Sequence, residues 1–113
     1  MILKTGGKTF TVTLENNKTA EALLEMLPMT LNMEELNGNE KYFYLSDSLP
    51  VDAVTMTKIN EGDIMMYGSS CIVVFYKTFN SGYRYTPVGH IDNIEGLRTA
   101  LGAGNAEVTF EKK

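Results

Sequence analysis

Short stretches with alternating apolar and polar residues recur along this chain, and they constrain its fold more than any other feature. Residues 8–14, 29–33 and 106–111 each alternate in this way. A period of two places successive side chains on opposite faces of a β-strand. Two further runs, 64–67 and 71–76, are almost continuously apolar and predict strands at the centre of the core. The pattern therefore indicates a mainly β protein.

Turn residues divide these stretches into separate strands. Gly6-Gly7, Asn37-Gly38 and Gly68-Ser69-Ser70 each stand between two of them, and such pairs favour tight turns. The longest loop is expected at 46–61, and a second loop, rich in aromatic residues, at 78–86. We expect eight strands in all, over residues 1–5, 8–14, 29–33, 41–45, 64–67, 71–76, 88–91 and 106–111.

Two short helices are expected between the strands. The first begins at Asn16-Asn17, where an asparagine side chain can cap the first turn. Apolar residues at i, i+3, i+4 and i+7 follow from Ala20 to Leu27, and Pro28 ends the helix. The second begins at Asp92 or Asn93 and ends at Gly102. The spacing of the elements predicts a small closed barrel of eight strands with two short helices.

Composition limits the possible partners. The chain has 113 residues, 43% of them hydrophobic, and a net charge of -4, which predicts one domain over 1–113. The acidic balance argues against nucleic acid and anionic membranes. Cys71 is the single cysteine, so no internal disulfide is possible. The N-terminus lacks an apolar signal region, so we expect a cytoplasmic location, or export if a signal has been removed. The sequence does not decide whether the protein is a monomer or a dimer.

Three segments in the middle of the chain carry a resemblance to a known family. They are Leu36-Asn37-Gly38-Asn39-Glu40-Lys41-Tyr42, Glu61-Gly62-Asp63-Ile64-Met65-Met66-Tyr67-Gly68 and Phe75-Tyr76-Lys77-Thr78-Phe79. Together with the order of elements, they resemble the bacterial cyclophilin-like domain family, which implies a cyclophilin-type barrel with the two short helices capping its ends. True cyclophilins carry a catalytic arginine in a Phe-His-Arg stretch, a glutamine-rich segment and a tryptophan. This chain has no Trp, no Gln and no Phe-His-Arg, so the resemblance implies the fold without the isomerase signature.

Aromatic residues form the densest candidate site. They gather on the strand at 41–45 and around the second predicted loop, and tyrosine suits peptide and small-ligand surfaces because it joins an apolar ring to a polar tip. We expect a peptide- or small-ligand-binding module with an aromatic pocket at a barrel mouth. The candidate ligand-binding residues are Glu40, Tyr42, Tyr44, Tyr76, Phe79, Tyr83, Arg84 and Tyr85.

Two enzymatic alternatives remain open. In a divergent peptidyl-prolyl isomerase, Arg84 would be the catalytic candidate, with Tyr42, Tyr76 and Phe79 as the proline pocket. In a small metabolite enzyme, carboxylates such as Glu40 and Asp63 would act as acid and base. However, Asp63 follows Gly62, a placement that also favours a turn bond at the start of a strand.

Metal and cofactor chemistry has little support in the sequence. His90 is the single histidine, and a metal site needs three or four ligands. A cysteine inside an apolar run, as Cys71 is, usually has an unreactive thiol. No phosphate-cradling glycine loop opens a helix. We expect neither a metal nor a cofactor.

Overall fold

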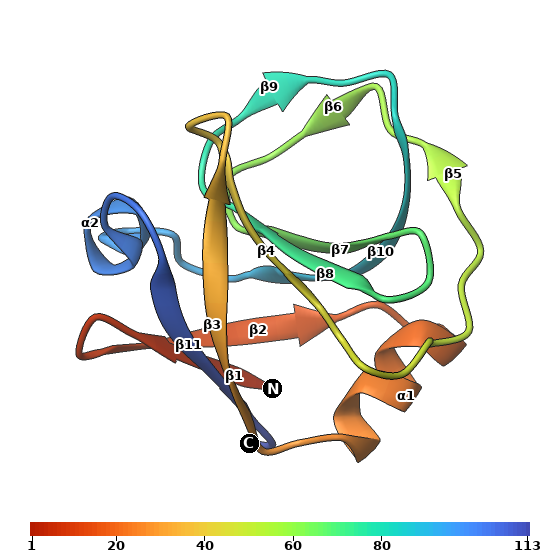
Figure 1. The fold of residues 1–113 in the computed structure, drawn as a ribbon, viewed down its shortest axis with the longest axis horizontal. Coiled ribbons are helices and arrows are strands. Elements are labelled where there is room, and N and C mark those ends of the chain that lie inside the picture. The colour runs from red at the N-terminus through yellow and green to blue at the C-terminus, as the bar shows by residue number, and fades with distance from the viewer.

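The computed structural model describes residues 1–113, in which eight antiparallel strands close into a barrel (Figure 1). Around the barrel the strands follow the order β2-β1-β11-β3-β4-β8-β7-β10, and β10 pairs with β2 to close it. This confirms the predicted barrel. The eight strands are β1 (Ile2–Thr5), β2 (Lys8–Leu14), β3 (Met29–Leu36), β4 (Glu40–Tyr44), β7 (Asp63–Tyr67), β8 (Cys71–Phe75), β10 (Arg84–Ile91) and β11 (Ala106–Glu111).

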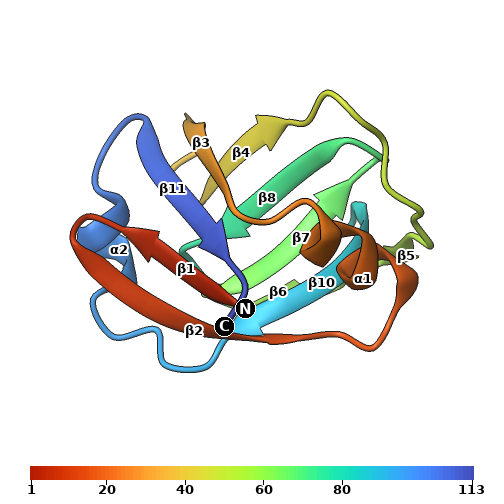
Figure 2. The ribbon, with the colours of Figure 1, turned by 90° about the horizontal axis from the view of Figure 1, so that it is seen from below.

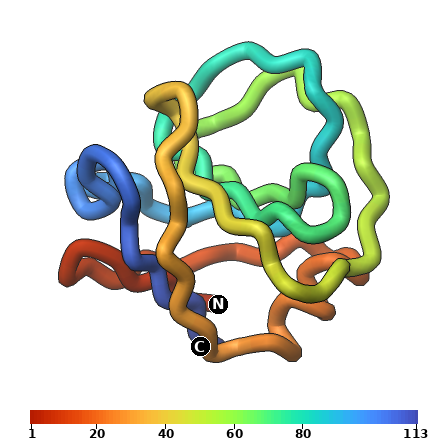
Figure 3. Tube along the Cα trace, viewed as in Figure 1, coloured from red at the N-terminus to blue at the C-terminus, as the bar shows by residue number.

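Three two-residue strands lie in the segments that were expected to be irregular loops. They are β5 (Val54–Thr55), β6 (Lys58–Ile59) and β9 (Phe79–Asn80). β6 pairs with β9, and β5 pairs with the start of β10. Both pairings join residues far apart in the chain, so they leave no local period in the sequence. Figures 1 and 3 show this excursion rising away from the barrel beside β7 and β8.

Strand β10 begins at Arg84, and the expectation that the strand starts at Val88 is wrong. Pro87 lies inside it, where the pairing with β7 shifts register between Pro87 and Gly89. A proline cannot donate to a ladder and is tolerated in a sheet mainly at such irregularities. The bulge therefore lets the strand continue through a residue that normally interrupts one.

The two helices match the prediction unequally. Helix α1 (Lys18–Glu25) begins after Asn17, whose side chain accepts a bond from the N–H of Ala20, as expected. Helix α2 (Leu97–Leu101) is shorter than predicted, and its expected start at Asp92 or Asn93 is wrong. Asn93 accepts a bond from the N–H of Glu95, which forms a turn, and Gly96 follows with a φ of 81°. Figure 2 shows the helices on opposite sides of the barrel.

The barrel wall around β8 separates two apolar layers. The interior holds 23 buried residues, to which both helices contribute, and a second layer of 6 covers the outer face. On β8, Ile72 and Val74 face the interior, whereas Cys71, Val73 and Phe75 belong to the outer layer. Burial on both faces explains why all five residues of β8 are apolar.

No helix in the structure is both long enough and apolar enough to cross a membrane.

Candidate functional site

Two adjoining hollows lie on the outer face of the barrel wall, beside the second apolar layer. Their volumes are about 240 and 200 Å³, and both are lined by Leu36, Glu40 and Tyr67. We call them together the tyrosine groove, because five tyrosines line it. These tyrosines are Tyr42, Tyr44, Tyr67, Tyr83 and Tyr85.

The alternation of β4 explains why its side chains point into the groove. Glu40, Tyr42 and Tyr44 lie opposite Phe75, Val73 and Cys71 of β8, which belong to the outer layer. The intervening residues of β4 face the interior of the barrel. The groove therefore forms on the outside of the wall, and not at a barrel mouth as expected.

Two pairs of tyrosine rings in the groove meet edge to face, and a third pair is tilted. The Tyr67 ring centroid lies 6.5 Å from that of Tyr83, with the rings at 88°, and 5.6 Å from that of Tyr85. Tyr42 and Tyr44 lie 6.0 Å apart at 81°. Several of these rings stay open to solvent, including Tyr83 at 66% and Tyr44 at 63% exposure. Clustered exposed aromatic residues commonly mark binding surfaces.

Glu40 is the one acidic side chain in the groove. It is only 8% exposed, and its carboxyl makes no hydrogen bond or ion pair with the rest of the chain. Burial, followed by the charge of Glu35, raises the pKa of Glu40 to about 7. The group can therefore be either an acid or a carboxylate near neutral pH.

Two further groups in the groove are made less acidic by their surroundings. Burial, with a smaller effect of the Glu40 charge, raises the pKa of Tyr85 to about 12. Burial also raises the pKa of the Cys71 thiol. A buried thiol with a raised pKa is a poor nucleophile. The groove therefore offers aromatic surface and one carboxyl, and no activated nucleophile.

The structure brings together five of the eight predicted ligand-binding residues. Glu40, Tyr42, Tyr44, Tyr83 and Tyr85 all line the groove.

The other three predicted residues lie elsewhere. Phe79 packs on Phe75, with ring centroids 5.7 Å apart, and supports the outer layer. Arg84 donates a hydrogen bond to the carbonyl of Ala53 and lines neither hollow. Tyr76 belongs to the interior layer.

Tyr67 and Leu36 are groove residues that the sequence analysis did not identify. Tyr67 ends the apolar run of β7 and was included in the predicted core strand. It shares the outer face with Met65, because the two are two residues apart. Met65 lies under the outer layer, whereas Tyr67 is 47% exposed. The only feature of the sequence that indicates this exposure is the position of Tyr67 at the end of its strand, directly before the Gly68 turn.

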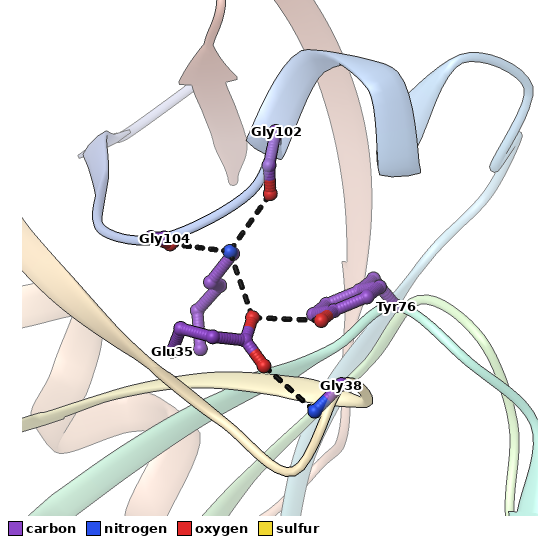
Figure 4. Close-up of polar contacts among 6 residues, drawn as sticks. Glu35, Gly38, Tyr76, Gly102 and Gly104 are labelled. Atoms are coloured by element: carbon purple, nitrogen blue, oxygen red, sulfur yellow. Dashed lines mark hydrogen bonds and ion pairs between the residues drawn. The ribbon is translucent and has the colours of Figure 1, made fainter.

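A buried ion pair on the opposite face of β4 was also missed. Lys41 is fully buried, and its Nζ donates to Glu35 Oε1 at 2.9 Å, to the Gly102 carbonyl at 2.8 Å and to the Gly104 carbonyl (Figure 4). The Tyr76 hydroxyl donates to the same oxygen of Glu35 at 2.7 Å. These contacts connect the β3–β4 hairpin to the segment between α2 and β11.

The partners of Glu35 determine its charge state. Burial alone would raise the pKa of Glu35, but hydrogen bonds from Tyr76, Lys41 and the Gly38 N–H lower it overall. Burial and Glu35 together raise the pKa of Tyr76 to about 12. The Tyr76 hydroxyl is thus engaged in holding the hairpin.

The remaining polar candidates have local roles. The Asp63 carboxylate accepts a bond from the N–H of Asn60 at 2.8 Å, which confirms the expected turn. Asp63 does not line the groove that holds Glu40. His90 Nε2 lies 3.8 Å from Asp92 Oδ1, and both side chains are exposed.

The chain is a closed antiparallel barrel with a second apolar layer, and a tyrosine-lined groove, on the outside of its wall. A model of the cyclophilin-like family matches residues 3–111, and the chain belongs to this family. The resemblance seen in the sequence is thereby confirmed. No curated protein and no solved structure gives a significant match to the sequence.

Proposed function

We propose that this cyclophilin-like domain is a binding module, which holds a peptide or a small ligand in the tyrosine groove without chemical turnover. The observation that carries the proposal is the gathering of five tyrosines around two adjoining hollows. Tyrosine provides a large, rigid contact area with little loss of side-chain entropy on binding. The same surface contains no activated nucleophile.

The geometry of Arg84 bears on the isomerase alternative. Catalysis of prolyl rotation would require a donor directed at the amide of a bound peptide. The Arg84 guanidinium donates to the Ala53 carbonyl instead and does not line the groove. No observation favours this alternative over binding.

The proposal is tested by NMR titration of labelled protein with a fragment library and with short Xaa-Pro peptides. We expect shifts confined to the groove, and a loss of binding of about tenfold or more in Tyr67→Ala, because an aromatic anchor is removed. Val51→Ala, which removes an exposed apolar side chain outside the groove, should leave binding unchanged.

Two results would count against the binding module. One is ligand shifts that map away from the groove or persist in Tyr67→Ala. The other is accelerated cis/trans exchange of the Xaa-Pro peptide that Arg84→Ala abolishes, which would establish the isomerase.

A further inference from the structure

We infer that the ligand of the tyrosine groove carries an alkylammonium cation, which the tyrosine rings surround and for which Glu40 is the counter-ion. This inference rests on the proposed binding function and names the chemical class of its ligand.

The first argument is the unpartnered carboxyl of Glu40. The structure satisfies Glu35, five residues earlier, with donors from Lys41, Tyr76 and Gly38. Glu40 is more deeply buried, and no group of the chain donates to its carboxyl, whose oxygens are open only to the groove. A buried carboxylate without a partner is strongly unfavourable, so such groups are normally paired. The chain thus leaves a place for a positive charge.

The second argument is that the chain cannot supply that charge itself. No lysine or arginine lines either hollow. Lys41 is on the opposite face of β4, and its ammonium contacts Glu35 and the carbonyls of Gly102 and Gly104. Arg84 is engaged with Ala53. A cation that pairs with Glu40 would therefore come from another molecule.

The third argument is the chemistry of the groove walls. The face of an aromatic ring carries negative potential, and a cation placed over it is attracted, more strongly when water is excluded. Tyr67 and Tyr83 stand at 88° to each other, as Tyr42 and Tyr44 do at 81°, so rings of differing orientation line the hollows that Glu40 also lines. The methylene or methyl groups of an alkylammonium would also contact their apolar surface.

Other ligand charges fit the groove less well. An anion would meet Glu40 and, behind it, Glu35, whose charge already acts on Glu40. A neutral ligand would leave Glu40 without a counter-ion, and the carboxyl would have to stay protonated and donate to that ligand. Binding of a neutral ligand to protonated Glu40 is therefore the alternative that the test must distinguish from binding of a cation.

The test compares choline with 3,3-dimethylbutan-1-ol, which has the same shape but a carbon in place of the charged nitrogen. Both are titrated into labelled protein at pH 8 and followed by NMR. We expect choline to bind at the groove about tenfold more tightly than the alcohol. In Glu40→Gln this preference should vanish, whereas Glu25→Gln, which removes an exposed acid at the end of α1, should retain it.

The outcomes separate this inference from the proposed function. Equal binding of both probes at the groove, or a preference that persists in Glu40→Gln, would overturn the cation and leave the groove as a ligand site. Binding of neither probe, while fragments still occupy the groove, would also overturn the cation alone. A peptide containing trimethyllysine, compared with free choline, then distinguishes a protein side chain from a small molecule as the source of the cation.

Discussion

Two carboxyl groups of the β3–β4 hairpin, those of Glu35 and Glu40, have opposite surroundings. Beside the interior face, Glu35 is held by Lys41, Tyr76 and the Gly38 N–H, and its pKa is lowered overall. On the outer face, Glu40 has no donor, and burial raises its pKa to about 7. The Lys41 network therefore ties the β3–β4 hairpin to the segment before β11, whereas the Glu40 carboxyl faces the tyrosine groove without a donor from the chain.

The pH dependence of stability should differ in sign between these two groups. Glu35, with its lowered pKa, stabilises the fold above the pKa of the unfolded chain, and this contribution is lost as pH falls. Glu40, with its raised pKa, makes its full contribution below the unfolded value of about 4.5. That contribution is lost as pH rises through about 7.

The largest effect is expected from Lys41→Met, which keeps an unbranched side chain, one atom shorter, but removes its charge. Glu35 and the carbonyls of Gly102 and Gly104 then lose their donor, and we expect the free energy of unfolding to fall by about 3 kcal/mol. Urea denaturation measures the loss. Lys4→Met, which breaks the exposed pair with Glu111, should change stability by less than about 1 kcal/mol. Similar losses in both variants would contradict a structural role for the Lys41 network.

The double variant Lys41→Met, Glu35→Gln tests whether Lys41 acts mainly through Glu35. If the two residues act as a pair, the double variant should be more stable than the sum of the single losses predicts, because no unpaired charge remains. Strict additivity would show that Lys41 acts through the two glycine carbonyls alone.

A smaller effect of opposite sign is expected from Glu40→Gln. In the wild-type protein, folding above pH 7 must bury an ionised Glu40 or protonate it, and the substitution removes this cost. Relative to wild type, the variant should gain on the order of 2 kcal/mol between pH 4 and pH 8. Denaturation at both pH values measures the gain. The glutamine amide changes the free energy of unfolding equally at both pH values, so the difference between them reports only the titration of Glu40. A gain that does not depend on pH would show that Glu40 is not the titrating group.

The sequence predicts the barrel better than it predicts the site. Alternation along β2, β3 and β11 survives in the structure because each of these strands has one buried face. The continuous apolar run of β8 indicates burial, but its sequence cannot show that the second buried face lies outside the barrel. That face depends on β6 and β9, which pair across residues 58–80 and carry no local pattern.

The site residues show the same limit. Alternation places Glu40, Tyr42 and Tyr44 on one face of β4, and these three were predicted together. Tyr76 continues the β8 run and was assigned to the same pocket, yet its hydroxyl reaches Glu35 instead. Lys41 carries no signal in the sequence, because a lysine in an alternating strand normally faces solvent, and the two carbonyls it bonds lie in a segment more than 60 residues later.

The smallest effect is expected when one tyrosine hydroxyl is removed, either from the Lys41 network (Tyr76) or from the tyrosine groove (Tyr85). Burial raises the pKa of both Tyr76 and Tyr85 to about 12, but only the Tyr76 hydroxyl donates a hydrogen bond within the chain, to Glu35. Tyr76→Phe should therefore cost about 1 kcal/mol of unfolding free energy. Tyr85→Phe should cost less than about 0.5 kcal/mol, because its ring packing on Phe75 is kept and no internal bond is lost. Thermal and urea denaturation of the two variants under one buffer condition provide the measurement. An equal or larger loss in Tyr85→Phe would mean that the groove is held together by its hydroxyl groups, as the Lys41 network is, and the distinction between the two faces of β4 would fail.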